Sequence, residues 1–353
     1  MAARLLARRG RKKPPRPTVL FSVSTASSPH LATGPTPQRG DVALDRPDLS
    51  VIVVTHNGRE KALETLRSAV AAQGWLDVEW LVVDAGSTDG TPEAVAGDFP
   101  AVKLFRRENR GFAASNNVAL REARGRYVLL LNPDVEFRQG SLAELVAAMD
   151  ARPEVGLASV IQSDVDGRPL PSIRRFPSPA RSFGEALFAD KWPVGRGLQE
   201  RVMSPGRYRQ AGAADWLVGA FLIARREAVE DVGPLDERFF LYSEECDWCY
   251  RFWQAGWQVE HLPNLTVVHH CGDGSSGALM PQLTHSRILF AEKHYGRAKA
   301  VGIRAGHVLR HALRAAIFAS LGLFSAPRRA RARNELACLN VALGTAEPPL
   351  GQS

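Results

Sequence analysis

The chain has 353 residues, of which 45% are hydrophobic and 23% charged, and its formal net charge is +8. This length and apolar content suit one large α/β domain with appendages, or two modest domains, and exclude a chain that is disordered throughout. The excess positive charge lies at the two ends, in residues 4–16 and 304–333, which indicates ends that meet an anionic partner such as a membrane or a nucleic acid. For the first run alone, solvated surface charge is the simpler interpretation.

The N-terminal segment, residues 1–47, is rich in Arg, Pro, Ser and Thr and shows no sustained periodicity. It cannot bury enough apolar surface to offset its ordering entropy, so we expect a disordered tail. Its apolar stretch is too short for a signal peptide, and export is therefore not indicated. The low number of cysteines, four in all, favours a reducing compartment and predicts a cytoplasmic protein.

From Leu49 onward, buried strands alternate with amphipathic helices. Apolar β-branched runs predict strands, and apolar residues at helical spacing predict helices. The expected strands are 49–55, 78–84, 102–105, 127–131 and 155–161, and the expected helices include 112–123 and 141–150. Regular alternation of this kind predicts an α/β fold with a mostly parallel central sheet flanked by helices.

The second half has a less regular pattern. Residues 176–210 contain much Arg, Pro and Gly and are expected to form a mobile loop over the site, whereas 214–224 reads as a strand and 244–255 as a helix. The predicted organisation is a catalytic domain over 48–280, a C-terminal helical region over 281–343 and a disordered tail over 344–353.

Gly and polar residues follow several strands at the point where each strand ends, at 56–58, 84–90 and 132–134. In open α/β sheets the ligand crevice lies at those carboxyl ends, so these loops predict one shared site. The segment from Asp84 through Gly86 and Ser87 to Thr91 could cradle a nucleotide, although the same pattern also makes an ordinary turn and helix cap.

Asp134 follows an apolar strand directly and is our candidate ligand for a hard divalent ion, Mg²⁺ or Mn²⁺. A capping aspartate in a turn is an equally good interpretation of this residue alone. Two histidines, His269 and His270, stand between a predicted strand and a glycine turn. Either could be a metal ligand, and a structural role is the alternative.

Three carboxylates, Glu244, Glu245 and Asp247, open a predicted helix. Carboxylates that repel one another raise each other's proton affinity, which suits a general base that deprotonates an alcohol. Acidic residues are also favourable at any helix N-terminus, which explains one of the three more easily than all of them.

Taken together, these segments resemble the family 2 inverting glycosyltransferases with the GT-A fold, in particular the rhamnosyltransferase-like members. The resemblance runs from about Leu49 to Ser276 and rests on the series: Val-Val-Thr55-His-Asn57, Asp84 to Thr91, Asn109 to Asn117, Asn132-Pro-Asp134, Asp215 to Ala220, Phe239 to Asp247, and His269-His270 with Gly-Ser-Ser.

This resemblance implies roles for individual residues. The resemblance implies that Thr55, Asn57 and Asp84 bind the nucleoside. Gly111, Phe112 and Asn116 would line the donor pocket. Trp216, Gly219 and Ala220 would shape the sugar and acceptor site. Asn132-Pro-Asp134 stands where the family has its metal-binding Asp-x-Asp, and Asn132 departs from that pattern, which leaves Asp134 as the direct ligand.

Glu245 matches the family's catalytic base, usually an aspartate, and Asp247 is kept as a second candidate. His270 fits the family's metal-contacting histidine by its distance to Ser275, and His269 fits it by its distance to the strand. The implied reaction is a single displacement that inverts the anomeric carbon, with dTDP-L-rhamnose as the implied donor.

Along residues 301–316, apolar side chains share one helical face: Val301, Ala305, Val308, Leu309, Ala312 and Ala316. Basic side chains share the other face: Arg304, His307, Arg310, His311 and Arg314. This segregation predicts a helix in an anionic membrane interface, peripheral to the inner face of the cell membrane, and packing on the catalytic domain is the alternative. A membrane-bound enzyme suggests a lipid-linked acceptor, either a polyprenyl diphosphate sugar or a growing glycan.

Two other functions fit parts of the pattern. A nucleotidyltransferase also uses a divalent ion and loops at strand ends, but it needs a basic Gly-rich loop after the first strand, and residues 56–60 carry one cation. A nucleic-acid-binding module would need a basic, aromatic-rich face in the folded part, where carboxylates cluster instead. We therefore expect no nucleic acid partner.

Overall fold

The structure is a computed structural model that describes residues 46–189, 193–270, 279–322 and 325–350. All of these described residues belong to one compact unit. The expected N-terminal tail lies outside the described residues up to position 45, as do the last three residues of the chain.

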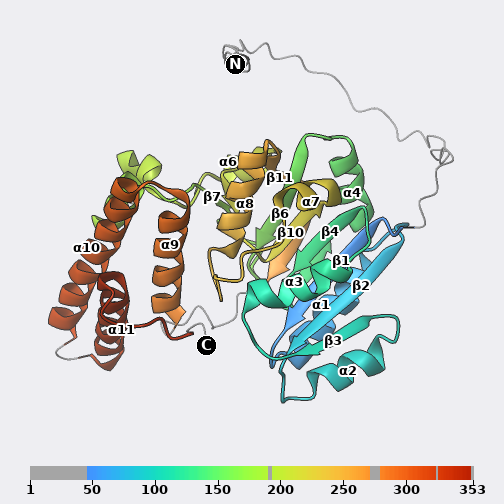
Figure 1. Ribbon diagram of the computed structural model, residues 1–353, viewed down its shortest axis with the longest axis horizontal. Coiled ribbons are helices and arrows are strands. Elements are labelled where there is room, and N and C mark those ends of the chain that lie inside the picture. Colours follow the sequence, from blue (N-terminus) through green and yellow to red (C-terminus); the bar gives the residue numbers. More distant parts are fainter. Residues whose placement is uncertain (1–45, 190–192, 271–278, 323–324, 351–353) are drawn as a thin grey trace, which may run out of the picture. The chain divides into compact units, whose positions relative to one another are not determined.

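The centre is a nine-stranded mixed sheet with the order β3-β2-β1-β4-β10-β6-β11-β5, in which β8 pairs with β11 (Figure 1). Its strands are β1 (Leu49–Thr55), β2 (Val78–Ala85), β3 (Lys103–Arg107), β4 (Tyr127–Leu131), β5 (Val135–Gln139), β6 (Val155–Ser163), β8 (Gly212–Ala213), β10 (Phe221–Arg225) and β11 (Gln258–His269). The first four of that order are parallel, so the ends of β1 and β2 meet, with Thr55 opposite Asp84. Strand β10 enters antiparallel between β4 and β6.

Helices cover both faces of this sheet. Helices α1 (Arg59–Ala71), α2 (Thr91–Asp98) and α4 (Leu142–Asp150) pack on one face, and α3 (Phe112–Glu122), α7 (Arg226–Val232) and α8 (Glu244–Ala255) pack on the other. Strands buried on both faces explain the continuous apolar runs of the sequence. Helix α4 begins with a capping box, in which Ser141 and Glu144 exchange hydrogen bonds. The α/β architecture expected from the sequence is thus confirmed.

Two sequence-based expectations about the second half need correction. Residues 214–224 are not one strand, because the short strand β9 (Trp216–Leu217) leaves the main sheet to pair with β7 (Ile173–Arg174) before β10 begins. Residues 176–210 are not a patternless loop. They contain α5 (Pro179–Ala186), the 3₁₀ helix η2 (Pro193–Leu198) and α6 (Pro205–Tyr208), which become ordered by packing on elements distant in sequence.

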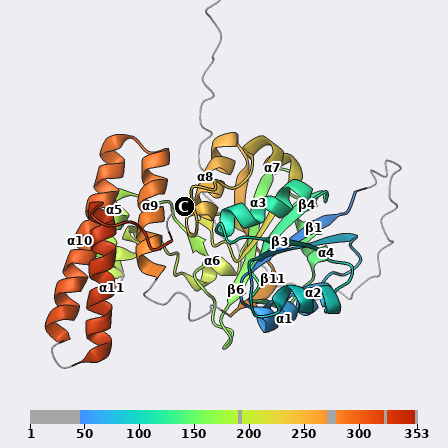
Figure 2. The same cartoon turned by 60° about the horizontal axis from the view of Figure 1, so that its bottom comes forward.

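The chain ends in α9 (Met280–His294), α10 (Arg297–Leu321) and α11 (Ala326–Leu343), and Figure 2 shows α5 among them. Helix α9 buries Phe290 in the same apolar core as α8, and α10 lies so close to α5 that Gly306 abuts Ser182. A boundary at residue 280 therefore does not separate two cores. Residues 344–350 return to this helical layer, where the Leu350 amide donates to Gln282.

The predicted faces of α10 are inverted in the structure. Its inward face is the one with basic residues, since His307 and His311 are buried and Arg310 pairs with Glu185 of α5 at 2.6 Å. The predicted apolar face points outward at Val301, which is 56% exposed. Carboxylates on α5 and α11 explain the inversion, because they pair with the basic groups that the sequence pattern assigned to the membrane. No helix in the described ranges is both long enough and apolar enough to cross a membrane.

Candidate active site

The loops after β1 and β2 lock onto each other through side chains that sequence analysis singled out. Asn57 has a left-handed backbone with φ of 49°, its amide donates to Ser87 Oγ at 2.9 Å, and its Oδ1 accepts from the Thr88 amide at 2.8 Å. The Ser87 amide donates to Asp84 Oδ2 at 3.0 Å. These contacts fix a backbone shape that leaves Gly86, with φ of 73°, next to the strand end.

Two oxygens at this strand end are buried without a hydrogen-bond partner among the described residues, Asp84 Oδ1 and Thr55 Oγ1. A cleft of about 400 Å³ lies beside them and is lined by Asp84, Gly86, Ser87, Thr88, Gly90, Pro92, Glu93, Arg106, Arg107 and Glu108. A buried acceptor that stays unpaired costs free energy unless a ligand donor reaches it. This end of the sheet can therefore hold a heterocycle that presents N–H groups. Sequence analysis missed the β3 end, Arg106 to Glu108, because its strand pattern is short and half exposed.

The segment that opens α3 shapes the site through its backbone. Gly111 has φ of 94°, and a Cβ there would lie 2.3 Å from the carbonyl oxygen of Phe240, so only glycine fits. The Phe112 amide donates to that same oxygen at 2.8 Å. Asn116 is buried and donates back to Phe112 of its own helix. The contact of Gly111 and Phe112 with the Phe240 carbonyl therefore joins the donor side to the loop before α8.

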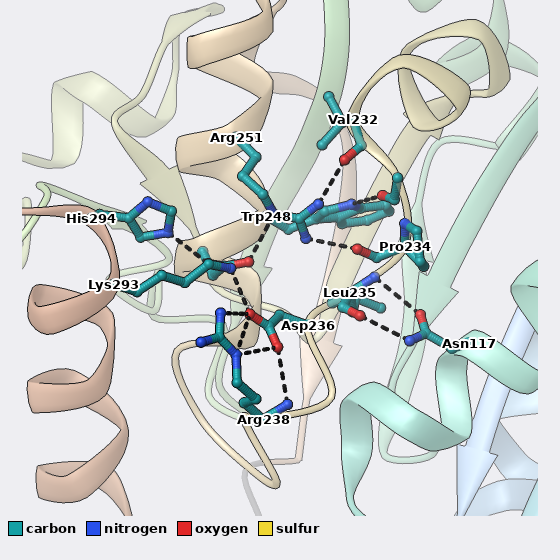
Figure 3. A network of polar contacts seen from close by, with 12 residues as sticks. Asn117, Val232, Pro234, Leu235, Asp236, Arg238, Trp248, Arg251, Lys293 and His294 are labelled. Carbon is teal, nitrogen blue, oxygen red and sulfur yellow. Dashed lines mark hydrogen bonds and ion pairs between the residues drawn. The ribbon is translucent and has the colours of Figure 1, made fainter.

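Asn117 is a residue of this segment that the sequence analysis gave no role. Its side chain donates to the Leu235 carbonyl at 2.9 Å, and its Oδ1 accepts from the Leu235 amide at 3.0 Å (Figure 3). Because this side chain pairs with both the backbone N–H and the carbonyl of Leu235, it fixes the loop after α7. The one sequence signal for this role is the adjacent pair Asn116-Asn117.

The candidate metal ligands lie where β4 and β11 end and β5 begins. His269 Nε2 is 3.3 Å from Asp134 Oδ1, whereas His270 Nε2 is 3.0 Å from Glu136 Oε2. The β5–β11 ladder sets His269 opposite Val135, and beyond it the His270 amide donates to the Asp134 carbonyl at 2.9 Å, so the side-chain contacts and not the register distinguish the two rings. Asn132 Oδ1 is buried without a partner in the described part of the chain. Asp134 and His269 thus form a carboxylate–imidazole pair, and His270 lies apart from it.

No group of three or more potential metal ligands occurs among the described residues. A hard divalent ion such as Mg²⁺ commonly takes one or two protein carboxylates and completes its shell with water and substrate phosphates. The donor set of Asp134 and His269 fits that requirement.

The loop before α8 aims two carboxylates at the same region. Tyr242 and Ser243 both have left-handed backbones, with φ of 69° and 66°, which is costly for residues other than glycine and is found where a site demands it. Helix α8 then opens with Glu244 and Glu245. Gly219 packs on Glu245 so closely that a Cβ would lie 3.4 Å from the Cβ of Glu245. Ala220, the next residue, accepts a hydrogen bond from the Asn132 amide at 2.9 Å. The structure therefore brings Glu245 and the Asn132–Asp134 turn to one site.

Burial and mutual repulsion tune the two carboxyl groups. Burial, with a smaller contribution from the charge of Glu245, raises the pKa of Glu244 well above 4.5. Burial also raises the pKa of Glu245, although a backbone hydrogen bond and the cations Arg174 and Arg287 offset part of that rise. Each group has one buried oxygen with no partner among the described residues. Glu245 thus combines raised proton affinity with partial exposure, which suits a general base.

Asp247 does not fit the role of a second base, and this expectation is corrected. Its side chain is fully buried and accepts hydrogen bonds from Arg251 Nε at 2.9 Å and from His294 Nε2 at 2.6 Å, and it also pairs with Lys293. Figure 3 shows Lys293 and His294 reaching from α9 toward the loop that carries Asp236, which binds Lys293 at 2.6 Å. Although burial alone would raise the pKa of Asp247, the His294 hydrogen bond and the charges of Arg251 and Lys293 lower it. Asp247 therefore joins α8 to α9.

Trp216 is buried, and its indole N–H donates to the Arg175 carbonyl at 3.0 Å. It lies three residues before Gly219 and packs in the core of the α8 face. Its packing anchors β9, which leads into the turn that carries Gly219 and Ala220.

Comparison with known proteins agrees with this architecture. The family model described as glycosyl transferase family 2 matches residues 50–232. A relative from Mycobacterium tuberculosis, named N-acetylglucosaminyl-diphospho-decaprenol L-rhamnosyltransferase, is 31% identical over 267 residues, which is 70% of this chain and 85% of the relative. Rhamnosyltransferase WbbL of Escherichia coli is 25% identical over 171 residues, 45% of this chain and 61% of the relative. The mannosyltransferase PcManGT from Pyrobaculum calidifontis, solved with GDP-Man and Mn²⁺, has a TM-score of 0.52 at 20% identity and covers 87% of this chain and 90% of its own.

The class of protein follows from the fold, which is the GT-A fold of enzymes that transfer sugars from nucleotides. The chain belongs to glycosyl transferase family 2.

Proposed function

We propose that this glycosyltransferase moves L-rhamnose from dTDP-L-rhamnose to a sugar carried on a polyprenyl diphosphate, with inversion at the anomeric carbon, in the synthesis of a cell-envelope polysaccharide. The convergence of Glu245 with the Asn132–Asp134 turn is the observation that supports this proposal, because a single displacement needs a base near the site of the diphosphate leaving group. The choice of sugar and acceptor rests on the names of the relatives from Mycobacterium tuberculosis and Escherichia coli.

The proposed donor occupies the cleft at the ends of β1 to β3. Its base would satisfy the unpartnered oxygens of Asp84 and Thr55, and its sugar would approach Gly111 and Phe112. Asp134 and His269 would hold a divalent ion, Mg²⁺ or Mn²⁺, which neutralises negative charge on the diphosphate when it is bound.

In the proposed reaction, Glu245 takes the proton of an acceptor hydroxyl, and that oxygen forms a bond to the anomeric carbon of the donor. The bond from this carbon to the phosphate oxygen breaks, and its electron pair leaves with the nucleoside diphosphate. The raised pKa of Glu245 makes it a better proton acceptor than an ordinary surface carboxylate. Gly219 lies directly beside Glu245, and an added Cβ there would be 3.4–3.7 Å from the Cβ, Cγ and Cδ of Glu245.

The test is transfer by the purified full-length chain. It would be incubated with Mg²⁺ or Mn²⁺, a polyprenyl diphosphate-linked N-acetylglucosamine, and in turn dTDP-L-rhamnose, GDP-mannose and UDP-N-acetylglucosamine. We expect product only with dTDP-L-rhamnose, with the opposite anomeric configuration by NMR. Efficient transfer from another nucleotide sugar would overturn the sugar assignment, and retained configuration would overturn the mechanism.

We also propose that the α10–α11 end of the protein binds an anionic membrane surface on the cytoplasmic side, where the acceptor lipid lies. The last turns of α10 expose two apolar residues, Ile317 and Leu321, the latter at 51%. The first turns of α11 expose Arg328, Arg331 and Arg333. They are neighbours, because Arg328 donates to the Leu321 carbonyl at 3.4 Å and Arg331 lies 5.8 Å from the Phe318 ring. Apolar groups rimmed by arginines suit a bilayer of anionic lipids.

Co-sedimentation with vesicles tests this surface. We expect binding to phosphatidylglycerol vesicles at low salt, little binding to phosphatidylcholine, and loss of binding in Arg328→Gln/Arg331→Gln and in Leu321→Ser. The matched control is Val70→Ser, which changes an exposed apolar residue on α1. Equal binding by all variants would reject the surface.

A further inference from the structure

A pair of arginines faces each other across two strand-like segments near the catalytic base. Arg174 of β7 stands opposite Arg201 in an antiparallel bridge, and on its other side it stands opposite Trp216 of β9. Residues directly opposite each other in such a ribbon have side chains on the same face. The Arg174 guanidinium lies over the Trp216 ring, 5.6 Å from its centroid. Arg201, Arg174 and Trp216 thus form a row.

Within the described residues, neither arginine of this row forms an ion pair with a carboxylate. Arg174 donates through Nε to the Pro171 carbonyl at 2.7 Å. The nearby carboxylate of Glu200 is occupied by Arg287 of α9 at 2.6 Å. Burial lowers the pKa of Arg174 to about 10; attraction to Glu200 offsets part of this fall, and repulsion from Arg201 and Arg287 adds to it. Like charges opposite each other destabilise a ribbon, so this arrangement is best explained by an anion that neutralises them.

The row lies near the proposed base. The Val218 amide donates to the Ser172 carbonyl at 3.0 Å, which fixes the Arg174 segment to the start of the turn that carries Gly219, and Gly219 packs on Glu245. Arg174 is also one of the cations that act on the Glu245 carboxylate. The Ser172 hydroxyl is buried and has no partner among the described side chains. An anion here would therefore belong to the molecule whose hydroxyl meets Glu245.

We infer that Arg174 and Arg201 bind the acceptor's phosphate, the diphosphate that links the acceptor sugar to its lipid. This inference rests on the proposed function, in which the acceptor sugar carries a diphosphate one pyranose ring away from the attacking hydroxyl. Arginine is suited to the role because its planar fork binds two phosphate oxygens at once. The stacking of Arg174 on Trp216 fixes the plane of that fork.

Two acceptors distinguish this subsite from a general effect on the base. One is N-acetylglucosamine on a short polyprenyl diphosphate, and the other is the same sugar as a neutral alkyl glycoside. We expect Arg174→Gln to raise the KM for the diphosphate acceptor by roughly 10- to 100-fold, the value of a charge-assisted hydrogen bond, and to leave the KM of the neutral acceptor within about twofold. The KM of Arg174→Lys for the diphosphate acceptor should lie between those of the wild type and Arg174→Gln, because lysine keeps the charge and loses the planar fork.

Arg201→Gln provides a second variant on an exposed position, where folding is not at risk, and we expect a rise of roughly three- to tenfold in the same KM. Arg209→Gln, on an exposed arginine of the same segment, is the matched control and should change nothing. An equal loss on both acceptors would overturn the inference, and a rise in donor KM instead would assign the arginines to the donor phosphates. If the wild-type chain used both acceptors equally well, the subsite would be rejected while the proposed function stood; transfer to neither would reject the function.

Discussion

The two halves of the site are held together in different ways. On the donor side, Asn57, Asp84 and Ser87 are fixed by hydrogen bonds between two neighbouring loops, each carried by a short stretch of sequence. On the base side, α8 is held by ion pairs with α9, a helix that lies beyond the family-matched segment. The shape of a loop between rigid strand ends is determined by a few adjacent residues. The position of a helix is determined by the elements that pack against it.

This difference predicts different responses to substitution. Donor-side and base changes that spare packing should reduce chemistry and leave folding intact. Changes in the ion pairs behind α8 should reduce both, because removing one partner of a buried pair leaves the other charged and desolvated.

The largest effect on catalysis is expected for Glu245→Gln. The amide keeps the shape of the side chain and cannot take a proton, so transfer should slow by roughly 10²- to 10⁴-fold. Binding of dTDP-L-rhamnose, measured by calorimetry, should be unchanged. The exposed Glu64→Gln is the matched control. Transfer at a near-normal rate by purified Glu245→Gln would show that another group is the base.

Asp134→Asn should cost several kcal/mol of transition-state stabilisation, or roughly 10²-fold or more in transfer rate, by weakening the hold on the divalent ion. The measurement is the rate as a function of Mn²⁺ concentration, whose midpoint should move to higher concentration. Thermal unfolding should change little, which separates this half of the site from the base side.

The two histidines supply the control for that experiment. His269→Ala should shift the Mn²⁺ midpoint in the same direction, because its ring is next to Asp134, and His270→Ala should not, because its ring is next to Glu136. The reverse result would assign the metal contact to His270, whose amide already donates to the Asp134 carbonyl at 2.9 Å.

The fold was largely predictable because its signals are local. Continuous apolar runs identify β1, β2, β4 and β6, and their bounds agree with the sequence prediction to within two residues. The region from 176 to 217 was not predictable, since its short strands and helices form only against partners elsewhere in the chain. The face of α10 was misjudged for a related reason. Periodicity reveals that the helix has two faces, but it does not show that Glu185 of α5 pairs with the basic face.

The site divides in the same way. Asp84, Asp134 and Glu245 could be identified because each opens a loop or helix after a strong apolar pattern. The choice between His269 and His270 depends on where each ring lies after β11 ends, which one sequence does not contain. The structural role of Asp247 depends on Lys293 and His294, far along the chain, and an aspartate two residues from the base looks catalytic until those partners are placed.

Asp247→Asn should remove about 3–5 kcal/mol from the free energy of unfolding, as for other broken buried ion pairs, measured by urea denaturation at pH 7. The folded-state pKa of Asp247 lies below the ordinary value of 3.8, so its stabilisation is complete above that value and is lost as the pH falls through the folded pKa. The variant should therefore show a weaker loss of stability on acidification below about pH 4. The matched control, Asp98→Asn, removes an exposed pair with Arg67 and should cost only about 0–1 kcal/mol.

The smallest effect concerns His307, which lies buried on α10 in a small cavity with Glu185, Glu200 and Arg287. Burial, together with the charges of Arg287 and Arg310, lowers its pKa well below 6.5. The unfolded chain then binds a proton that the folded protein does not, so stability is complete above pH 6.5 and falls as the pH drops below it. His307→Gln should flatten this slope by up to about 1.4 kcal/mol per pH unit in urea titrations between pH 5 and 6.5. His311 and His261 contribute in the same direction, so part of the slope should survive. An unchanged slope in the variant would mean that His307 is protonated in the fold, and the basic layer behind the catalytic helix would then carry more charge than its carboxylates balance.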